Sequence, residues 1–65
     1  MTKELFKEYK TEARKVKDSG LKAQMIECLD VAQDFNYPQS VFNGIIEATS
    51  INRLNTVMHT AIKYI

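Results

Sequence analysis

The sequence contains few of the residues that cross-link small folds or interrupt their helices and strands. Its 65 residues include one cysteine, one proline, two glycines and no tryptophan. Cys28 has no second cysteine for a disulfide, and Cys28 and His59 together cannot supply the roughly four ligands of a structural zinc site. We therefore expect neither metal nor cofactor. Glycine and proline, which interrupt helices, are few, and apolar residues recur with a regular period in the long segments between them. The sequence therefore favours helices over strands.

Long hydrophobic runs are also missing. No stretch approaches the about 18 apolar residues of a membrane span, and the charged segment after Met1 lacks the apolar core of a signal peptide. We expect a cytoplasmic protein without a membrane partner. The chain also lacks a phosphate-binding loop of the type G-x-x-x-x-G-K, and its carboxylates should lie on solvated helix faces. Neither an enzymatic activity nor a small-molecule substrate is therefore expected.

Charge is nearly balanced overall but unevenly distributed. The formal net charge is +1, which is typical neither of a strongly basic nucleic-acid binder nor of an acidic mimic. Residues 1–30 hold seven Lys or Arg and six Asp or Glu, whereas residues 31–65 hold only Asp34, Glu47, Arg53 and Lys63. The second half of the chain is therefore polar with few charges.

The apolar periodicity predicts an all-α protein, a small three- or four-helix bundle in which residues 1–65 form a single domain. The expected helices span about 3–17, 21–35, 38–48 and 51–64. Thr2 is a plausible N-cap, Asp18-Ser19-Gly20 should end the first helix, and Asn36-Tyr37-Pro38 should end the second. Ser50 can cap a fourth helix. The alternative is one helix from 38 to the C-terminus with a bend near Ser50.

Two residues inside the predicted helices need an explanation. Gly44 weakens its helix by up to about 1 kcal/mol relative to alanine, so it indicates either the close approach of another backbone or of a ligand, or merely a weak helix. Cys28 lies in the apolar stripe of the second helix, and the spacing to His59 does not bring a base beside it. We interpret Cys28 as a structural residue.

The first helix should have an apolar, a basic and an acidic face. Glu4, Glu8 and Glu12 lie on one side of its apolar stripe. The other flank carries a basic stripe of Lys3, Lys7, Lys10, Arg14 and Lys17. Such a stripe either contacts phosphates or an acidic partner, or is a solvated flank whose lysine stems cover the apolar seam.

The last two predicted helices allow a helix-turn-helix interpretation. In that alternative the protein is a DNA-binding transcriptional regulator using residues 38–64, with the second helix of the pair in the major groove. Asn and Arg are residue types that contact base edges. Only Arg53 and Lys63 are strongly basic in this half, which makes nucleic acid the second choice of partner. The helix entering the groove would present Asn52, Arg53, Asn55, Thr56 and His59.

The low charge of residues 31–65 favours a surface that binds protein. Interface centres are depleted in Lys, Glu and Asp and enriched in aromatic residues and Met. We therefore expect a small non-enzymatic regulatory or adaptor protein that binds another protein or a second copy of itself, such as a virus- or mobile-element-type inhibitor or modulator of a host protein. The residues expected at the interface are Tyr37, Phe42, Asn52, Asn55, Met58, His59 and Tyr64.

Overall fold

The computed structural model describes residues 2–62. These residues form four helices and no strand, so the predicted all-α bundle is confirmed in its four-helix form. The helices are α1 (Lys3–Arg14), α2 (Ser19–Asp34), α3 (Gln39–Glu47) and α4 (Ile51–Ala61).

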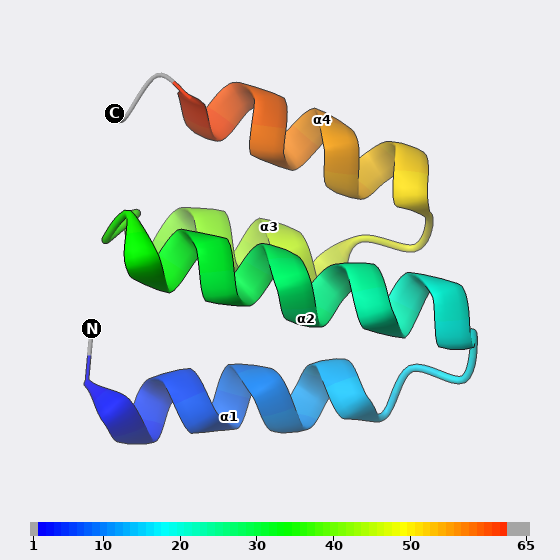
Figure 1. Ribbon diagram of the computed structural model, residues 1–65, viewed down its shortest axis with the longest axis horizontal. Helices are drawn as coiled ribbons and strands as arrows, with labels where there is room; N and C mark the ends of the chain where they lie inside the picture. The colour runs from blue at the N-terminus through cyan, green and yellow to red at the C-terminus, as the bar shows by residue number, and fades with distance from the viewer. Residues whose placement is uncertain (1, 63–65) are drawn as a thin grey trace.

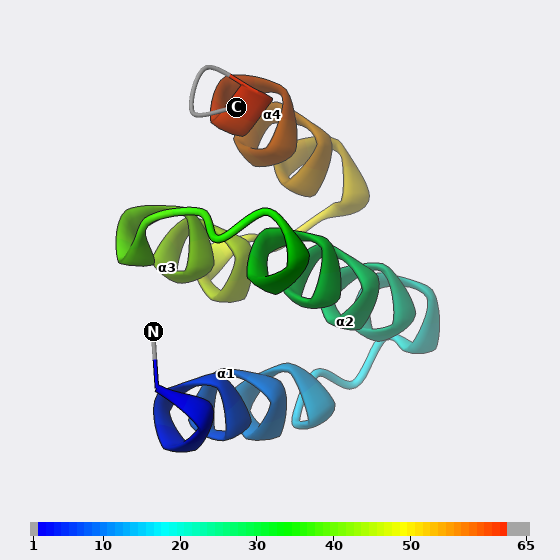
Figure 2. The same ribbon diagram turned by 60° about the vertical axis from the view of Figure 1, so that its left-hand side comes forward.

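The helices α2 and α3 form an antiparallel central pair, with α1 on one side of it and α4 on the other (Figures 1 and 2). Each outer helix packs on both members of the pair, while in the described part of the chain the backbones of α1 and α4 do not approach each other. The bundle measures 29 × 26 × 15 Å. This flat shape means that α2 contributes a flank to two different seams, one with α1 and one with α4.

The connection between α1 and α2 differs from the prediction. The first helix ends at Arg14 instead of about 17, and Asp18 begins the second helix instead of ending the first. The Asp18 side chain accepts hydrogen bonds from the backbone N–H groups of Gly20 (2.9 Å) and Leu21 (3.1 Å). An aspartate that satisfies free N–H groups at a helix start is an N-cap, which is why the glycine after it does not act as a stop.

The break after α2 is confirmed, and Asn36 provides its turn. Asn36 has φ 56°, in the left-handed region. Its N–H donates to the Gln33 carbonyl at 3.1 Å, and the N–H of Tyr37 donates to the Ala32 carbonyl at 2.9 Å. These two bonds define a Schellman motif, which satisfies the last carbonyls of the helix. Pro38 then precedes α3.

The break between α3 and α4 is confirmed as well. Ser50 has an extended backbone, and its Oγ accepts a hydrogen bond from the N–H of Arg53 at 3.2 Å. The Thr2 cap of α1 is confirmed in the same way, because its Oγ1 accepts from the N–H of Leu5 at 3.2 Å. Helix α4 ends at Ala61, and the predicted continuation to residue 64 lies outside the described residues.

The core is built around α3. Phe42 is fully buried and contacts the rings of Phe6 and Tyr9 from α1, at centroid distances of 6.3 and 5.4 Å. On the other side of α3, a Cβ at Gly44 would lie 3.1 Å from the Cγ1 atom of Val57 in α4. The group that approaches Gly44 is therefore a side chain instead of the predicted backbone or ligand, and the missing Cβ lets α4 pack closely on α3.

Candidate functional site

The exposed apolar side chains of the described residues belong to two elements, α2 with its C-cap and α4 with its C-cap. The large ones are Val31 (38% exposed), Phe35 (57%), Ile51 (45%) and Ile62 (56%). Two partly buried neighbours at helical spacing, Cys28 and Met58, connect them to the core. We call the set the α2–α4 face, which consists of Cys28, Val31, Phe35, Ile51, Met58 and Ile62.

On α2, the three residues of this face share one flank. Cys28, Val31 and Phe35 follow each other at steps of three and four, which places them on one side of the helix. Asp30 lies on the other side of the buried stripe and bonds Lys10 of α1 at 2.9 Å. Because α1 and α4 lie on opposite sides of the central pair (Figure 1), the flank that carries Val31 is the one toward α4.

On α4, the row of Ile51, Met58 and Ile62 lies away from the contact with α3. That contact is made by Val57, which packs against Gly44 on the other side of the buried stripe. Since α4 packs only on α3 and α2 within residues 2–62, the row of Met58 lies on the α2 side. The two helices run in the same direction (Figure 1). Their apolar rows therefore lie side by side along the α2–α4 seam.

The two edges of this face differ in charge. On α2, Glu27 and Asp34 are exposed and lie one helical turn before and after Val31. Within residues 2–62 neither carboxylate takes part in an ion pair. On α4, Asn55 and His59 are exposed next to Met58 and Ile62. Within residues 2–62, the face thus has an acidic edge on α2 and an edge on α4 that carries no carboxylate, lysine or arginine.

The aromatic anchors predicted from the sequence are corrected by their burial. Phe42 has no exposed surface, and Tyr37 is only 6% exposed, so neither ring is available to a partner in this fold. Tyr37 instead supports the exposed Phe35, whose ring stacks on it at a centroid distance of 5.9 Å. The predicted anchor Tyr64 lies outside the described residues. Met58 is half-buried on the α2–α4 face.

The interface predicted from the sequence did not include Val31, Phe35, Ile51 or Ile62. The spacing of Phe35, Ile51 and Ile62 fits the apolar stripes of their helices. A usable signal was the width of these stripes. An apolar arc broader than the about 100° that one packing interface buries leaves its margins uncovered.

The polar residues predicted for a helix-turn-helix are all exposed on α4. Arg53 and Thr56 line a hollow of about 250 Å³ with Ser40 of α3, and Thr56 lines a second hollow with Asn55 and His59. However, the helices α3 and α4 run nearly antiparallel in both views (Figures 1 and 2). The two helices of a helix-turn-helix cross at about 90–120° instead.

The basic stripe of α1 is partly used inside the fold. Lys10 donates to Asp30 and lies 5.3 Å from the centre of the Phe6 ring, so it covers the apolar seam between α1 and α2. Lys17 lies beyond the end of α1, in the connection to α2. The remaining exposed cations of the predicted stripe are Lys3, Lys7 and Arg14.

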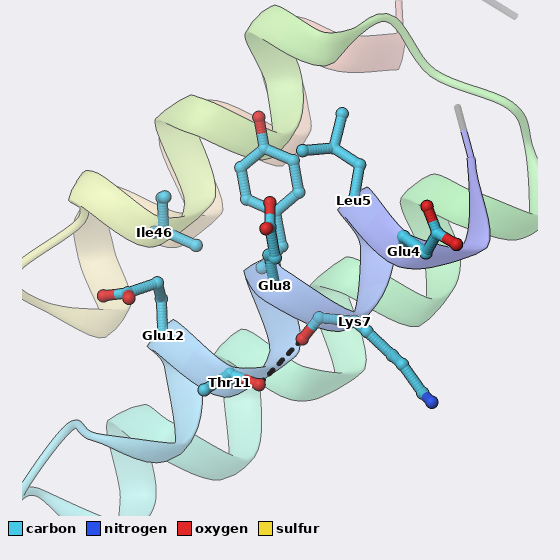
Figure 3. A pocket seen from close by; sticks show the side chains of 8 residues that line it. Glu4, Leu5, Lys7, Glu8, Thr11, Glu12 and Ile46 are labelled. Carbon is cyan, nitrogen blue, oxygen red and sulfur yellow. Dashed lines mark hydrogen bonds between the residues drawn. The ribbon is translucent and has the colours of Figure 1, made fainter.

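An open hollow of about 600 Å³ lies between α1 and α3 (Figure 3). Glu4, Glu8 and Glu12 border it, and Ile46 faces them from α3. Its lining contains no cysteine, serine or histidine, and the hydroxyl of its one threonine, Thr11, donates to the Lys7 carbonyl at 2.9 Å.

Cys28 is half-buried on the α2–α4 face instead of in the centre of the core. Burial raises the pKa of its thiol, and the nearby carboxylate of Glu27 adds to the rise. At neutral pH the sulfur is therefore protonated, which is the state of an unreactive cysteine.

Two further features, a metal site and a membrane-spanning helix, are considered for the described residues only. Among residues 2–62, no three side chains of His, Cys, Asp or Glu gather as metal ligands. In the same range, no helix has both the length and the apolar character needed to cross a membrane. No family model, curated protein or solved structure matches the chain. The functional proposal therefore depends on the surface itself.

Proposed function

We propose that the protein is a small non-enzymatic regulatory or adaptor protein that acts by binding another protein through the α2–α4 face. The observation that carries this proposal is the position of the exposed large apolar side chains of residues 2–62, all four of which lie on that face. Contiguous apolar surface at a soluble domain's exterior is typical of an interaction site. The mechanism is occlusion or tethering of the partner, without a chemical step.

The size of the chain supports the same proposal. A 65-residue domain buries only about 60% of the surface that its unfolded chain exposes, so its stability is low without a partner. A partner that binds only the folded chain adds RT ln(1 + [L]/Kd) to its stability. Covering the α2–α4 face would thus both remove apolar surface from water and stabilise the fold. An inhibitor or modulator of a host protein, as encoded by viruses and mobile elements, fits this design.

A paired pull-down tests the proposal. The bait is the tagged full chain, compared with a Val31→Lys/Ile62→Lys variant that places two cations on the face. The matched control is Thr11→Lys/Thr60→Lys, which adds the same charge at two exposed positions, one on α1 and one on another flank of α4. We expect wild type and control to retain the same protein through nuclease and high salt, and the face variant to lose it.

Two results would contradict the proposal. Equal capture by all three baits would show that the partner does not use the α2–α4 face. Material that disappears from all baits with nuclease or salt would instead support the DNA-binding alternative with residues 38–64, because phosphate contacts weaken steeply with salt.

A further inference from the structure

The apolar rows alone do not account for stable binding. Each of the four exposed side chains is about half covered already, so completing its burial contributes less than burying a whole side chain. Association also loses translational and rotational freedom, which opposes binding before any contact is counted. The partner must therefore also use the edges of the face, and the chemistry of these edges describes the partner.

The acidic edge contains two carboxylates that the fold does not use. Asp30 is engaged by Lys10 on the α1 side, but Glu27 and Asp34 enter no ion pair within residues 2–62. They lie directly beside Val31, at positions i−4 and i+3. A partner that covers Val31 comes close to both carboxylates. It loses affinity if it brings acidic groups there and gains if it brings cations.

Within residues 2–62, a second copy of this chain offers no cation on this face. Its own face would bring the same acidic edge, together with the edge of Asn55 and His59. In that range the cations of α2 and α4 are Lys22, which lies on the α1 side of the buried stripe, and Arg53, which lies toward α3. Pairing of two copies through these residues would therefore place no lysine or arginine against Glu27 and Asp34.

The shape of the face favours a helix. Two parallel helices form a straight seam with an apolar row on each side, and an amphipathic helix lying along such a seam contacts both rows through residues at i, i+3, i+4 and i+7. Accepting the proposed function, we infer that the α2–α4 face binds an amphipathic helix of the partner protein whose α2-side flank carries lysine or arginine. Its other flank, over Asn55 and His59, is uncharged.

Selection from a helix library tests this inference without knowledge of the partner. The displayed peptides are 18-residue helices with fixed leucines along one stripe and Lys, Glu, Gln or Ala allowed at both flanks. Selection uses the wild-type chain, with the Val31→Lys/Ile62→Lys variant for counter-selection. We expect lysine enrichment on one flank only. Enrichment of Glu, lysine on both flanks or neither, or a failure to select any helix would overturn the inference.

A charge variant locates the contact. Binding of a selected peptide should weaken about fivefold in Glu27→Gln/Asp34→Asn, as expected for the loss of two exposed ion pairs, and the difference should shrink at high salt. The control is Glu8→Gln/Glu47→Gln, which removes the same charge on the α1–α3 side and should bind like wild type. Equal affinities for both variants would overturn the assignment of the basic flank.

Two measurements test whether the face is instead covered by a second copy of the chain or by residues 63–65. In sedimentation, the wild-type chain should be monomeric, and a dimer that dissociates in Val31→Lys/Ile62→Lys would assign the face to a second copy. A chain ending at Ile62 should bind the peptide as the full chain does, and a tenfold tighter complex would assign the face to residues 63–65. Peptides that bind the face whatever the charge of their flanks would overturn this inference alone. A pull-down partner that Val31→Lys/Ile62→Lys captures as well as wild type does would overturn the proposed function.

Discussion

The two sides of the central helix pair differ in how much apolar surface they leave exposed. Toward α1, Phe42 is closed in by Phe6 and Tyr9, and the Tyr9 hydroxyl donates to the Asn43 Oδ1 atom at 2.6 Å. Along the α2–α4 seam, Phe35 keeps more than half of its surface exposed, and no side-chain hydrogen bond joins α2 to α4 in the described range. The α1–α3 interface thus encloses its aromatic rings, while the α2–α4 face leaves apolar surface exposed.

Two phenylalanines, one in each region, give the sharpest test of this difference. Phe42→Ala should cost about 3–5 kcal/mol, the usual loss for truncating a buried ring, whereas Phe35→Ala should cost less than about 1 kcal/mol because the ring is half solvated already. A domain of this size has about 3–5 kcal/mol of stability in all, so Phe42→Ala should not fold. Urea unfolding followed by circular dichroism measures both variants.

A milder variant keeps that comparison quantitative. Phe42→Leu retains most of the volume and should remain folded with a loss of about 1.5 kcal/mol. If Phe35→Ala proved as destabilising as Phe42→Leu, Phe35 would be part of the core, and the division of the molecule into a closed and an open side would be incorrect.

The hydrogen bond between α1 and α3 should contribute less than the rings. Tyr9→Phe removes the donor to Asn43 and keeps the ring, so we expect a loss of about 1 kcal/mol in the free energy of unfolding. Asn43 is exposed, and water can replace the lost partner. A double-mutant cycle with Asn43→Ala isolates the pair, and a coupling energy near zero would show that the bond adds nothing to the α1–α3 interface.

The turn at Asn36 connects the two regions, because it separates the exposed Phe35 from the buried Tyr37. Asn36→Ala should lower stability by about 0.5–1 kcal/mol, since a Cβ is strained at this left-handed φ and alanine lacks the local hydrogen bonding of asparagine. Asn36→Gly should be neutral or stabilising, because glycine relieves the strain. Thermal unfolding of the two variants tests this order, and equal values would mean that the backbone angle is not under strain.

Local chemistry made most of the fold predictable. Ser50 and Thr2 were identifiable as caps because a hydroxyl at a helix start has one evident partner, and Pro38 excludes the residue before it from a helix. Asp18 was misassigned because Asp-Ser-Gly fits both the end of one helix and the start of the next. The difference is decided by which free N–H groups the carboxylate reaches, and that depends on the angle at which α2 leaves the turn.

The candidate site was less predictable, because periodicity shows which residues share a flank but not which flank another helix covers. Tyr37 was expected at the surface, yet the turn at Asn36 directs it into the core and leaves Phe35 outside. Met58 is half-buried on the α2–α4 face, and its role in partner binding stays a prediction. The acidic edge of Glu27 and Asp34 acquired significance only when Asp30 was found to be engaged by Lys10.

Cys28 should report on the open face without changing the fold. Its pKa is raised by burial and by Glu27, so that the thiolate is rarer at pH 8 than in a free cysteine peptide. We therefore expect iodoacetamide to modify Cys28 more slowly than the peptide, with a rate that grows as the pH rises toward the raised pKa. Glu27→Gln removes the repulsive charge, lowers the pKa and should accelerate the reaction by no more than about fivefold.

The same reaction distinguishes an open α2–α4 face from a covered one. If a helix binds along the seam, alkylation of Cys28 should slow in proportion to the occupied fraction. A Cys28 that reacts as fast as the free peptide at every pH would show that the thiol is solvated. The apolar row on α2 would then begin at Val31, and the acidic Glu27 would face water instead of a partner helix.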